Sequence, residues 1–209
     1  MTYKEIKKDI IDTINLPLQA EPYFMVGEKY DTLTNQSDKD IYLHVIKELI
    51  VHENMQYRFA GLVALNIMHK ELDCKEEIKY CVDNFSPEKE IKLVTRLLSA
   101  CAVISEDWAI NFIRQILHEF KFANNKEHIY EQAINSASLS LHWKELMNEI
   151  NFAISAYDNI TFNDFIAFFK YIRGKKDYKE FKEMLTAENL NRLSIQKHYI
   201  EERYKMYKR

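Results

Sequence analysis

The 209-residue sequence predicts an all-α protein, a short solenoid of about four helical hairpins with capping helices at both ends. Only three glycines and three prolines occur, far below the average usage of about 7% and 5%, which leaves little of the turn chemistry that strands need. Apolar residues recur at helical spacing along most of the chain. The stretch from Asp40 to Lys70 predicts two apolar-faced helices joined by a polar corner. Such a hairpin must stack on others to bury both faces.

Composition places the chain among ordinary globular proteins. Apolar residues make up 47% of the sequence and charged residues 29%, with a net charge of −3, so nothing demands a nucleic acid or a membrane as partner. The length suits one domain over residues 1–209. No signal-type apolar block is evident, and we expect a cytoplasmic protein that makes no membrane contact. The three cysteines are odd in number and lie in helical patterns, which predicts reduced, buried thiols.

The first helix is predicted over Thr2–Asn15 and is expected to cap the stack. Its apolar face repeats at helical spacing, with Ile6, Ile10, Ile11 and Ile14. Residues 16–37 contain Pro17, Pro22 and Gly27 and show no helical period, so they predict a long loop. Loops of this length are uncommon in compact domains. We expect it to pack as an apolar flap over the end of the stack.

The next two helices form the clearest hairpin. The first of them is predicted to begin near Ser37 or Asp38 and to end at His52–Asn54. Its buried stripe is predicted to be Ile41, Val45, Ile46, Leu49 and Ile50. The second carries Met55, Phe59, Leu62, Val63 and Ile67 inward. The small residues Ala60, Gly61 and Ala64 mark where another helix backbone comes close.

The segment from Tyr57 to Leu65, YRFAGLVAL, resembles the second helix of a HEAT repeat. That helix typically opens with a Val-Arg pair and continues with small residues before a leucine; here Arg58 matches the arginine, and Tyr57 stands in place of the valine. The preceding helix also resembles a first HEAT helix, without that family's usual proline. The resemblance to HEAT-like and armadillo-type repeats implies a right-handed α-solenoid of about four HEAT-like helical hairpins. It also implies that Arg58 pairs with an acidic corner residue of a neighbouring repeat.

The internal repeat is clearer in the polar corners between helices than in the helices themselves. An acidic residue or asparagine followed by asparagine occurs at four places, at intervals of 30, 41 and 34 residues. These pairs are Glu53–Asn54, Asp83–Asn84, Asn124–Asn125 and Asp158–Asn159. Asparagine tolerates the left-handed conformation that a helix C-terminus needs when glycine is scarce. We therefore predict these pairs as the four turns within hairpins.

The remaining helices follow from these corners. First helices of the later hairpins are predicted over Asp73–Phe85, Ser105–Phe122 and Leu141–Tyr157. The second helices of these three hairpins are predicted to begin at three places. One begins after Ser86–Pro87–Glu88, one after the corner Asn124–Asn125, and one at a capping-box-like start from Thr161 to Asp164. Their buried residues are predicted as Ile91, Val94, Leu97, Leu98, Cys101, Ile129, Ala133, Ile134, Ala137, Phe162, Phe165, Ile166, Phe168 and Phe169. Residues 175–209 then supply basic C-terminal capping helices, one short and one long.

The C-terminal segment supports an alternative function, nucleic-acid binding. Residues 170–209 hold twelve Lys or Arg and six Asp or Glu, interleaved with tyrosines that could stack on bases. Asp107, Trp108 and Arg114 are similar in type to the pocket residues of the DNA alkylation repeat glycosylases, which are HEAT-like, but they do not align with that family's motif. The overall net charge favours an ordinary amphipathic helix with solvated lysines.

The sequence contains two sets of candidate residues for metal binding or catalysis. His44, Glu48 and His52 share one helical stripe, yet no HExxH motif or second ligand cluster accompanies them, so we expect neither a metal nor another cofactor. The cysteines Cys74, Cys81 and Cys101 lack a nearby base in the sequence pattern, which favours core packing over nucleophilic chemistry. We expect a protein that is not an enzyme.

The sequence thus predicts a non-enzymatic protein–protein interaction module, of adaptor or immunity/inhibitor type, that binds its partner in the solenoid groove. The candidate contacts are polar residues of the second helices that do not fit the apolar stripe, namely Arg58, Asn66, Lys92, Arg96, Tyr130 and Asn135. The alternative is a HEAT-like nucleic-acid-binding protein that resembles the DNA alkylation repeat proteins.

Overall fold

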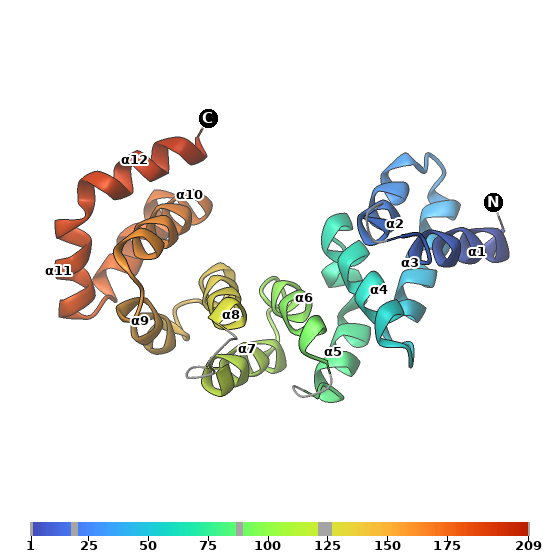
Figure 1. Ribbon diagram of the computed structural model, residues 1–209, viewed down its shortest axis with the longest axis horizontal. Coiled ribbons are helices and arrows are strands. Elements are labelled where there is room, and N and C mark those ends of the chain that lie inside the picture. The colour runs from blue at the N-terminus through green and yellow to red at the C-terminus, as the bar shows by residue number, and fades with distance from the viewer. Residues whose placement is uncertain (1, 18–20, 87–89, 121–126, 209) are drawn as a thin grey trace. The chain divides into compact units, whose positions relative to one another are not determined.

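The computed structural model describes residues 2–17, 21–86, 90–120 and 127–208 (Figure 1). Within these ranges every regular element is a helix, so the predicted all-α class is confirmed. The chain divides into two compact units, residues 1–104 and 105–209, which we describe separately. The expectation of a single domain stays a prediction. No helix in the described ranges is both long enough and apolar enough to cross a membrane.

The N-terminal unit is built around one helix, α4, whose middle is fully buried. The described residues of this unit form six helices and a short 3-10 turn, and they are α1 (Tyr3–Ile14), α2 (Pro22–Thr32), α3 (Gln36–Ile50), α4 (Met55–Met68), the 3-10 turn (Glu71–Cys74), α5 (Lys75–Asp83) and α6 (Ile91–Cys101). Helix α4 contacts α2, α3 and α6, while α3 also contacts α5 and α1. Residues 60–65 of α4 are all buried because neighbours cover several of its sides. The predicted hairpin of α3 and α4 is confirmed.

The predicted loop over residues 16–37 is wrong, because α2 occupies half of it. Pro22 stands at the start of α2, where a missing N–H costs nothing. Gly27 lies inside the helix because α4 comes close there, and a Cβ at this position would lie 2.9 Å from Ile67 Cβ. The Tyr42 hydroxyl of α3 donates to the Val26 carbonyl. Two of the three residues that suggested a loop, Pro22 and Gly27, are therefore a helix start and a close helix contact.

Helix ends are capped differently from the prediction. Asn54 adopts φ −77° and accepts a hydrogen bond from Gln56 N at 2.8 Å, so it is an N-cap and not a left-handed residue. Asp158 is likewise an N-cap, because it accepts a hydrogen bond from Thr161 N at 2.8 Å. Helix α10 therefore begins at Asn159, before the predicted capping-box-like start at Thr161. Asn35, two residues before the predicted Ser37, caps α3. Side-chain acceptors at N-termini thus explain these corners. The predicted features at residues 87–88 and 124–125 lie outside the described residues.

In the C-terminal unit, residues 105–120 and 127–208 are described and form the helices α7 (Asp107–Phe120), α8 (Glu127–Leu139), α9 (Met147–Ser155), α10 (Asn159–Glu183), α11 (Ala187–Ile195) and α12 (Lys197–Tyr207). Helix α8 contacts α7, α9 and α10, and α10 contacts α12, which lies beside it in Figure 1. Gly174 interrupts α10 with φ 75°, a value that favours glycine. Gln196 separates α11 from α12, so the predicted single long C-terminal helix is two helices.

The helix predicted over Leu141–Tyr157 starts only at Met147. Residues 140–146 form turns instead, in which Ser140 Oγ accepts from His142 N at 3.1 Å. Trp143 is buried there, and its ring meets the Phe169 ring edge-on with centroids 5.4 Å apart. Burial of this large ring in the core takes precedence over local helix formation.

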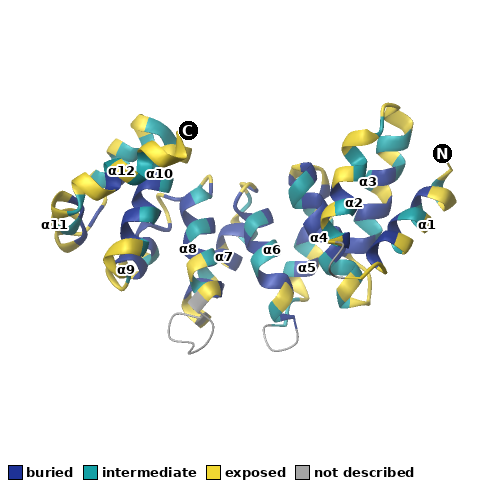
Figure 2. Ribbon diagram, turned by 45° about the horizontal axis from the view of Figure 1, so that its top comes forward, coloured by how far each residue is buried: buried dark blue, intermediate teal, exposed yellow. Residues whose placement is uncertain are grey.

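Most predicted core residues are buried. Figure 2 shows helices such as α1 with buried and exposed residues side by side, as expected for amphipathic helices. Ile11, Ile41 and Ile91 are only partly buried, whereas Tyr42 and Leu93 take core places that were not predicted. A buried polar link joins α9 to α11, where Asn189 Nδ2 donates to the Asn151 carbonyl at 2.9 Å.

Candidate functional site

Two of the predicted partner contacts are held in internal hydrogen bonds. Arg58 Nη2 on α4 donates to Glu90 Oε1 just before α6, and their side chains are only 17% and 11% exposed. Asn66 Nδ2 donates to Glu71 Oε1 at 3.2 Å. Both contacts link elements of the N-terminal unit, so each residue has a structural role in the free protein.

Lys92 and Arg96 lie one turn apart on α6 beside an open cavity of about 520 Å³. The cavity is lined by Leu16, Tyr23, Met55, Gln56, Phe59 and Lys92. The Arg96 guanidinium carbon lies 5.8 Å from the centroid of the Phe59 ring, a cation–π distance. Burial lowers the pKa of Arg96. The Tyr23 ring meets Phe59 edge-on, with centroids 5.0 Å apart.

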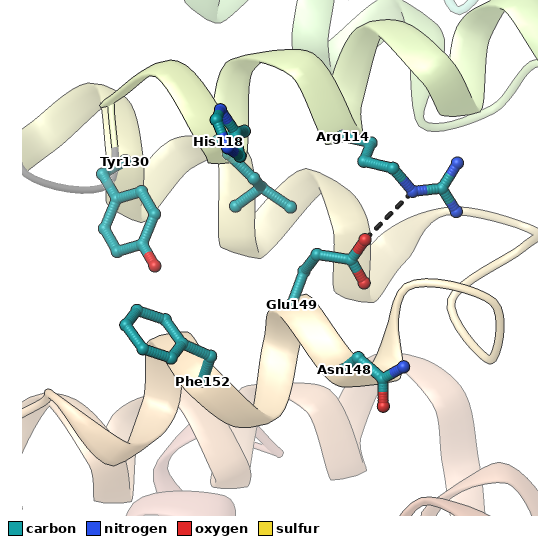
Figure 3. A pocket seen from close by; sticks show the side chains of 7 residues that line it. Arg114, His118, Tyr130, Asn148, Glu149 and Phe152 are labelled. Atoms are coloured by element: carbon teal, nitrogen blue, oxygen red, sulfur yellow. Dashed lines mark hydrogen bonds and ion pairs between the residues drawn. The ribbon is translucent and has the colours of Figure 1, made fainter.

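Tyr130 belongs to a pocket of about 320 Å³ in the C-terminal unit, which we call the Tyr130 pocket. Three helices supply its walls, with Arg114, Leu117 and His118 from α7, Tyr130 from α8, and Asn148, Glu149 and Phe152 from α9. In Figure 3 the Tyr130 side chain points with its hydroxyl end toward the Phe152 ring. The Phe152 side chain is 44% exposed although it is fully apolar.

An ion pair marks the polar end of the Tyr130 pocket. Arg114 Nε lies 3.0 Å from Glu149 Oε1, the contact drawn as a dashed line in Figure 3, and Arg114 Nη1 donates to Asn111 Oδ1 at 3.2 Å. Burial raises the pKa of Tyr130, which keeps its phenol neutral and able to donate a hydrogen bond. The pocket therefore offers an apolar wall, a phenol and a charged rim.

The six predicted contacts are divided between the two units, with Arg58, Asn66, Lys92 and Arg96 in the N-terminal unit and Tyr130 and Asn135 in the C-terminal unit. Lys92, Tyr130 and Asn135 each line a different pocket, and the Asn135 pocket lies on the side of α8 that faces α10. Their role in binding stays a prediction. Sequence reasoning missed Glu149 and Phe152. A signal existed for Phe152, because it falls two residues after Ile150 and so lies off the buried stripe of Leu146, Ile150 and Ile154.

Several basic residues of the C-terminal segment are bound to the protein itself. Arg173 donates to the carbonyls of Ser138 and Ser140, and Arg192 donates to the carbonyl of Ile154 at 3.1 Å and to that of Tyr157. Two further cations form ion pairs within the unit, Lys170 with Glu201 and Arg203 with Asp164. These contacts hold α10, α11 and α12 in place.

The residues weighed for metal binding and nucleophilic chemistry have other contacts. Glu48 accepts hydrogen bonds from Lys7 Nζ at 2.6 Å and Tyr3 Oη at 2.5 Å, which hold the pKa of its carboxyl below the usual range. In the described ranges no group of three or more His, Cys, Asp or Glu is placed to share a metal ion. All three cysteines are buried and free, and burial raises the pKa of the Cys74 and Cys81 thiols to about 12.

Comparison with protein families, with curated proteins and with solved structures finds no match to this chain.

Proposed function

We propose that this protein is a non-enzymatic protein–protein interaction module, of adaptor or inhibitor type, that binds its partner through the Tyr130 pocket. The observation that carries the proposal is an exposed phenylalanine beside an open, largely apolar pocket with a charged rim. Protein interfaces have this composition, with aromatic anchors at the centre and polar groups around them. Tyr, Phe and Arg are also enriched in interfaces.

The geometry suggests which partner group would enter. An apolar side chain would lie between the rings of Tyr130 and Phe152, where it would remove both from water. The polar groups of its backbone would meet the Tyr130 hydroxyl and the Arg114–Glu149 pair. Burial of the exposed part of Phe152 would supply the hydrophobic gain, and the ion pair would fix the orientation.

We also propose that each unit is a short stack of HEAT-like hairpins. Support comes from the order of contacts in the N-terminal unit, where the first helices α3 and α5 touch each other and the second helices α4 and α6 do the same. The pair of Arg58 with Glu90 fits the arginine contact that the HEAT resemblance implies. A cytoplasmic location remains part of this proposal, consistent with three free, buried cysteines.

Photo-crosslinking tests the Tyr130 pocket directly. A benzoylphenylalanine in place of Phe152 should give a discrete protein adduct in the native host, and Tyr130→Ala should weaken that adduct. The matched control carries the same group in place of Phe24, a phenylalanine of the N-terminal unit that is also 44% exposed. Equal adducts at both positions, or no protein adduct at Phe152, would overturn the proposal.

The nucleic-acid alternative receives its own test. Because Arg173 and Arg192 are engaged with carbonyl oxygens, we expect labelled DNA to bind only at the level of non-specific contacts, with Kd of about 10⁻⁴ to 10⁻⁶ M at physiological salt. Fluorescence anisotropy with single- and double-stranded DNA measures this. Submicromolar binding that weakens steeply with salt would place the protein in the nucleic-acid class.

A further inference from the structure

A second pocket of the C-terminal unit combines aromatic rings with carboxylates. We call it the acidic aromatic pocket, and its volume is about 170 Å³. Its lining comes from α8, the end of α9, α10 and α12, and consists of Glu131, Asn135, Tyr157, Thr161, Asp164, Phe165, Phe168 and Tyr207. These described lining residues include four aromatic rings and two carboxylates and no Lys, Arg or His.

The rings are organised as contacting pairs. Tyr157 meets Phe165 at 6.2 Å between centroids with planes at 73°, and Phe168 meets Tyr207 at 5.7 Å and 63°. Tyr207 also stacks on Tyr171 at 5.9 Å. Each ring is therefore held by at least one other ring. Aromatic faces carry negative charge density, so several fixed rings around a small space attract a cation.

The carboxylates add a net negative charge. Asp164 Oδ1 lies 3.0 Å from Arg203 Nε on α12, which balances one charge. Glu131 is exposed, and among the described contacts no cation pairs with it. The pocket and its neighbouring Arg203 together therefore carry one uncompensated negative charge. An entering monovalent cation would neutralise it, whereas an anion would be repelled.

Burial, with a smaller effect of the carboxylates, keeps the phenols of the pocket protonated. Burial, and then the charge of Glu131, raise the pKa of Tyr157. Burial and Asp164 likewise raise the pKa of Tyr207, and Arg203 opposes them. Both phenols therefore stay neutral, so they contribute ring faces and hydroxyl groups but no further charge.

Neutral acceptors complete the site. The Thr161 hydroxyl donates to Asp158 Oδ2 at 3.2 Å, which leaves its oxygen lone pairs free to accept a hydrogen bond. Asn135 lies one turn after Glu131 on α8, and its amide group lines the same pocket. A donor with several N–H groups could meet these oxygens and the Glu131 carboxylate at once. One water occupies roughly 30 Å³ in the liquid, so the pocket accommodates a compact head group and not a folded segment.

We propose that the acidic aromatic pocket binds an alkylammonium group, whether a lysine side chain of a polypeptide or a small free amine carries it. The aromatic pairs provide cation–π attraction, Glu131 provides the balancing charge, and Asn135 and Thr161 accept N–H bonds. This inference is independent of the partner proposed for the Tyr130 pocket. It also gives Asn135, predicted from the sequence as a contact residue, a chemical role.

NMR titration of the full chain with small probes tests the proposal. n-Butylammonium should bind saturably, with ring-current shifts of its CH₂ protons, and the neutral 1-butanol of similar size should not. Glu131→Gln should weaken binding by about tenfold, because one charge-assisted contact is lost. Phe168→Leu should also weaken binding and reduce the ring-current shifts. Glu188→Gln, an exposed carboxylate of the same unit outside this pocket, is the matched control and should leave binding unchanged.

Titrations with two further probes identify the source of the cation. Tetramethylammonium lacks N–H groups, so weaker binding than n-butylammonium would show that the acceptors contribute. Tighter binding of a capped Gly-Gly-Lys-Gly-Gly peptide would indicate a lysine of a polypeptide, and equal binding would indicate a small amine. Absence of saturable binding by n-butylammonium, equal binding of 1-butanol, or a Glu131→Gln effect of less than about twofold would overturn the proposal.

Discussion

Replacement of Gly27 by alanine tests the packing of α2 against α4. In a free helix this change would stabilise by about 1 kcal/mol, because alanine is the better helix former. Here the new Cβ would lie 2.9 Å from both Cβ and Cγ2 of Ile67 and 3.1 Å from its Cδ1. Favourable carbon contacts lie at about 3.5–4.0 Å. Ile67 Cβ is bonded directly to the α4 backbone, so rotation of the side chain can move Cγ2 and Cδ1 but does not relieve the clash with Cβ.

The expected net effect is a loss of stability. Overpacking costs about 1–3 kcal/mol, which exceeds the gain in helix propensity over most of that range. We expect Gly27→Ala to destabilise the N-terminal unit by about 1–2 kcal/mol, measured by urea unfolding followed by circular dichroism. Both tryptophans, Trp108 and Trp143, lie in residues 105–209, so their fluorescence follows the other unit in the same sample.

Two further variants make the test specific. Glu28→Ala, at an exposed neighbouring position of α2, should change stability by no more than about 0.5 kcal/mol. Ile67→Ala removes Cγ2 and Cδ1, so the Gly27→Ala/Ile67→Ala double variant should be more stable than the sum of the single effects predicts. Neutral or stabilising behaviour of Gly27→Ala would refute the close approach of α2 and α4, because without that contact only the gain in helix propensity would remain.

Three other predictions concern the cores of the two units. Glu90→Ala should lower the free energy of unfolding by about 3 kcal/mol, because it leaves Arg58 without its partner. Replacement of both Arg58 and Glu90 by methionine should lower it by less. Equal losses for the two variants in denaturant unfolding would contradict this prediction. Ala64→Leu should destabilise by about 1–3 kcal/mol through overpacking of the buried α4, and an unchanged melting temperature would contradict that placement. The pKa of His142 is raised by hydrogen bonds to Glu145 and to the Ser105 carbonyl. Its contribution to stability should therefore be complete below the unfolded pKa of about 6.5 and be lost as the pH rises through the folded pKa; His142→Gln should remove this dependence in urea titrations followed by tryptophan fluorescence.

The sequence by itself determined the all-α class and most of the core. Few glycines and prolines and a regular apolar spacing were enough, because an amphipathic helix is a local pattern that the chain carries wherever it packs. The stripes of α3, α6 and α8 were predicted for this reason, and so were the buried, reduced cysteines. Arg58 was predicted as a partner contact, and the HEAT resemblance implied that it also pairs with an acidic residue; in the structure it pairs with Glu90, which was not predicted.

Tertiary structure decided the features that depend on distant neighbours. Helix α2 was not predicted because proline and glycine, here Pro22 and Gly27, usually break helices. Only the close approach of Ile67 explains why a glycine lies inside this helix. Trp143 left its predicted helix because its ring packs on Phe169, 26 residues later in the chain. Both pockets likewise join side chains from three or more elements, and no local spacing encodes which of these elements meet. Local periodicity fixes where helices form, but long-range packing fixes which of their exposed residues share a site.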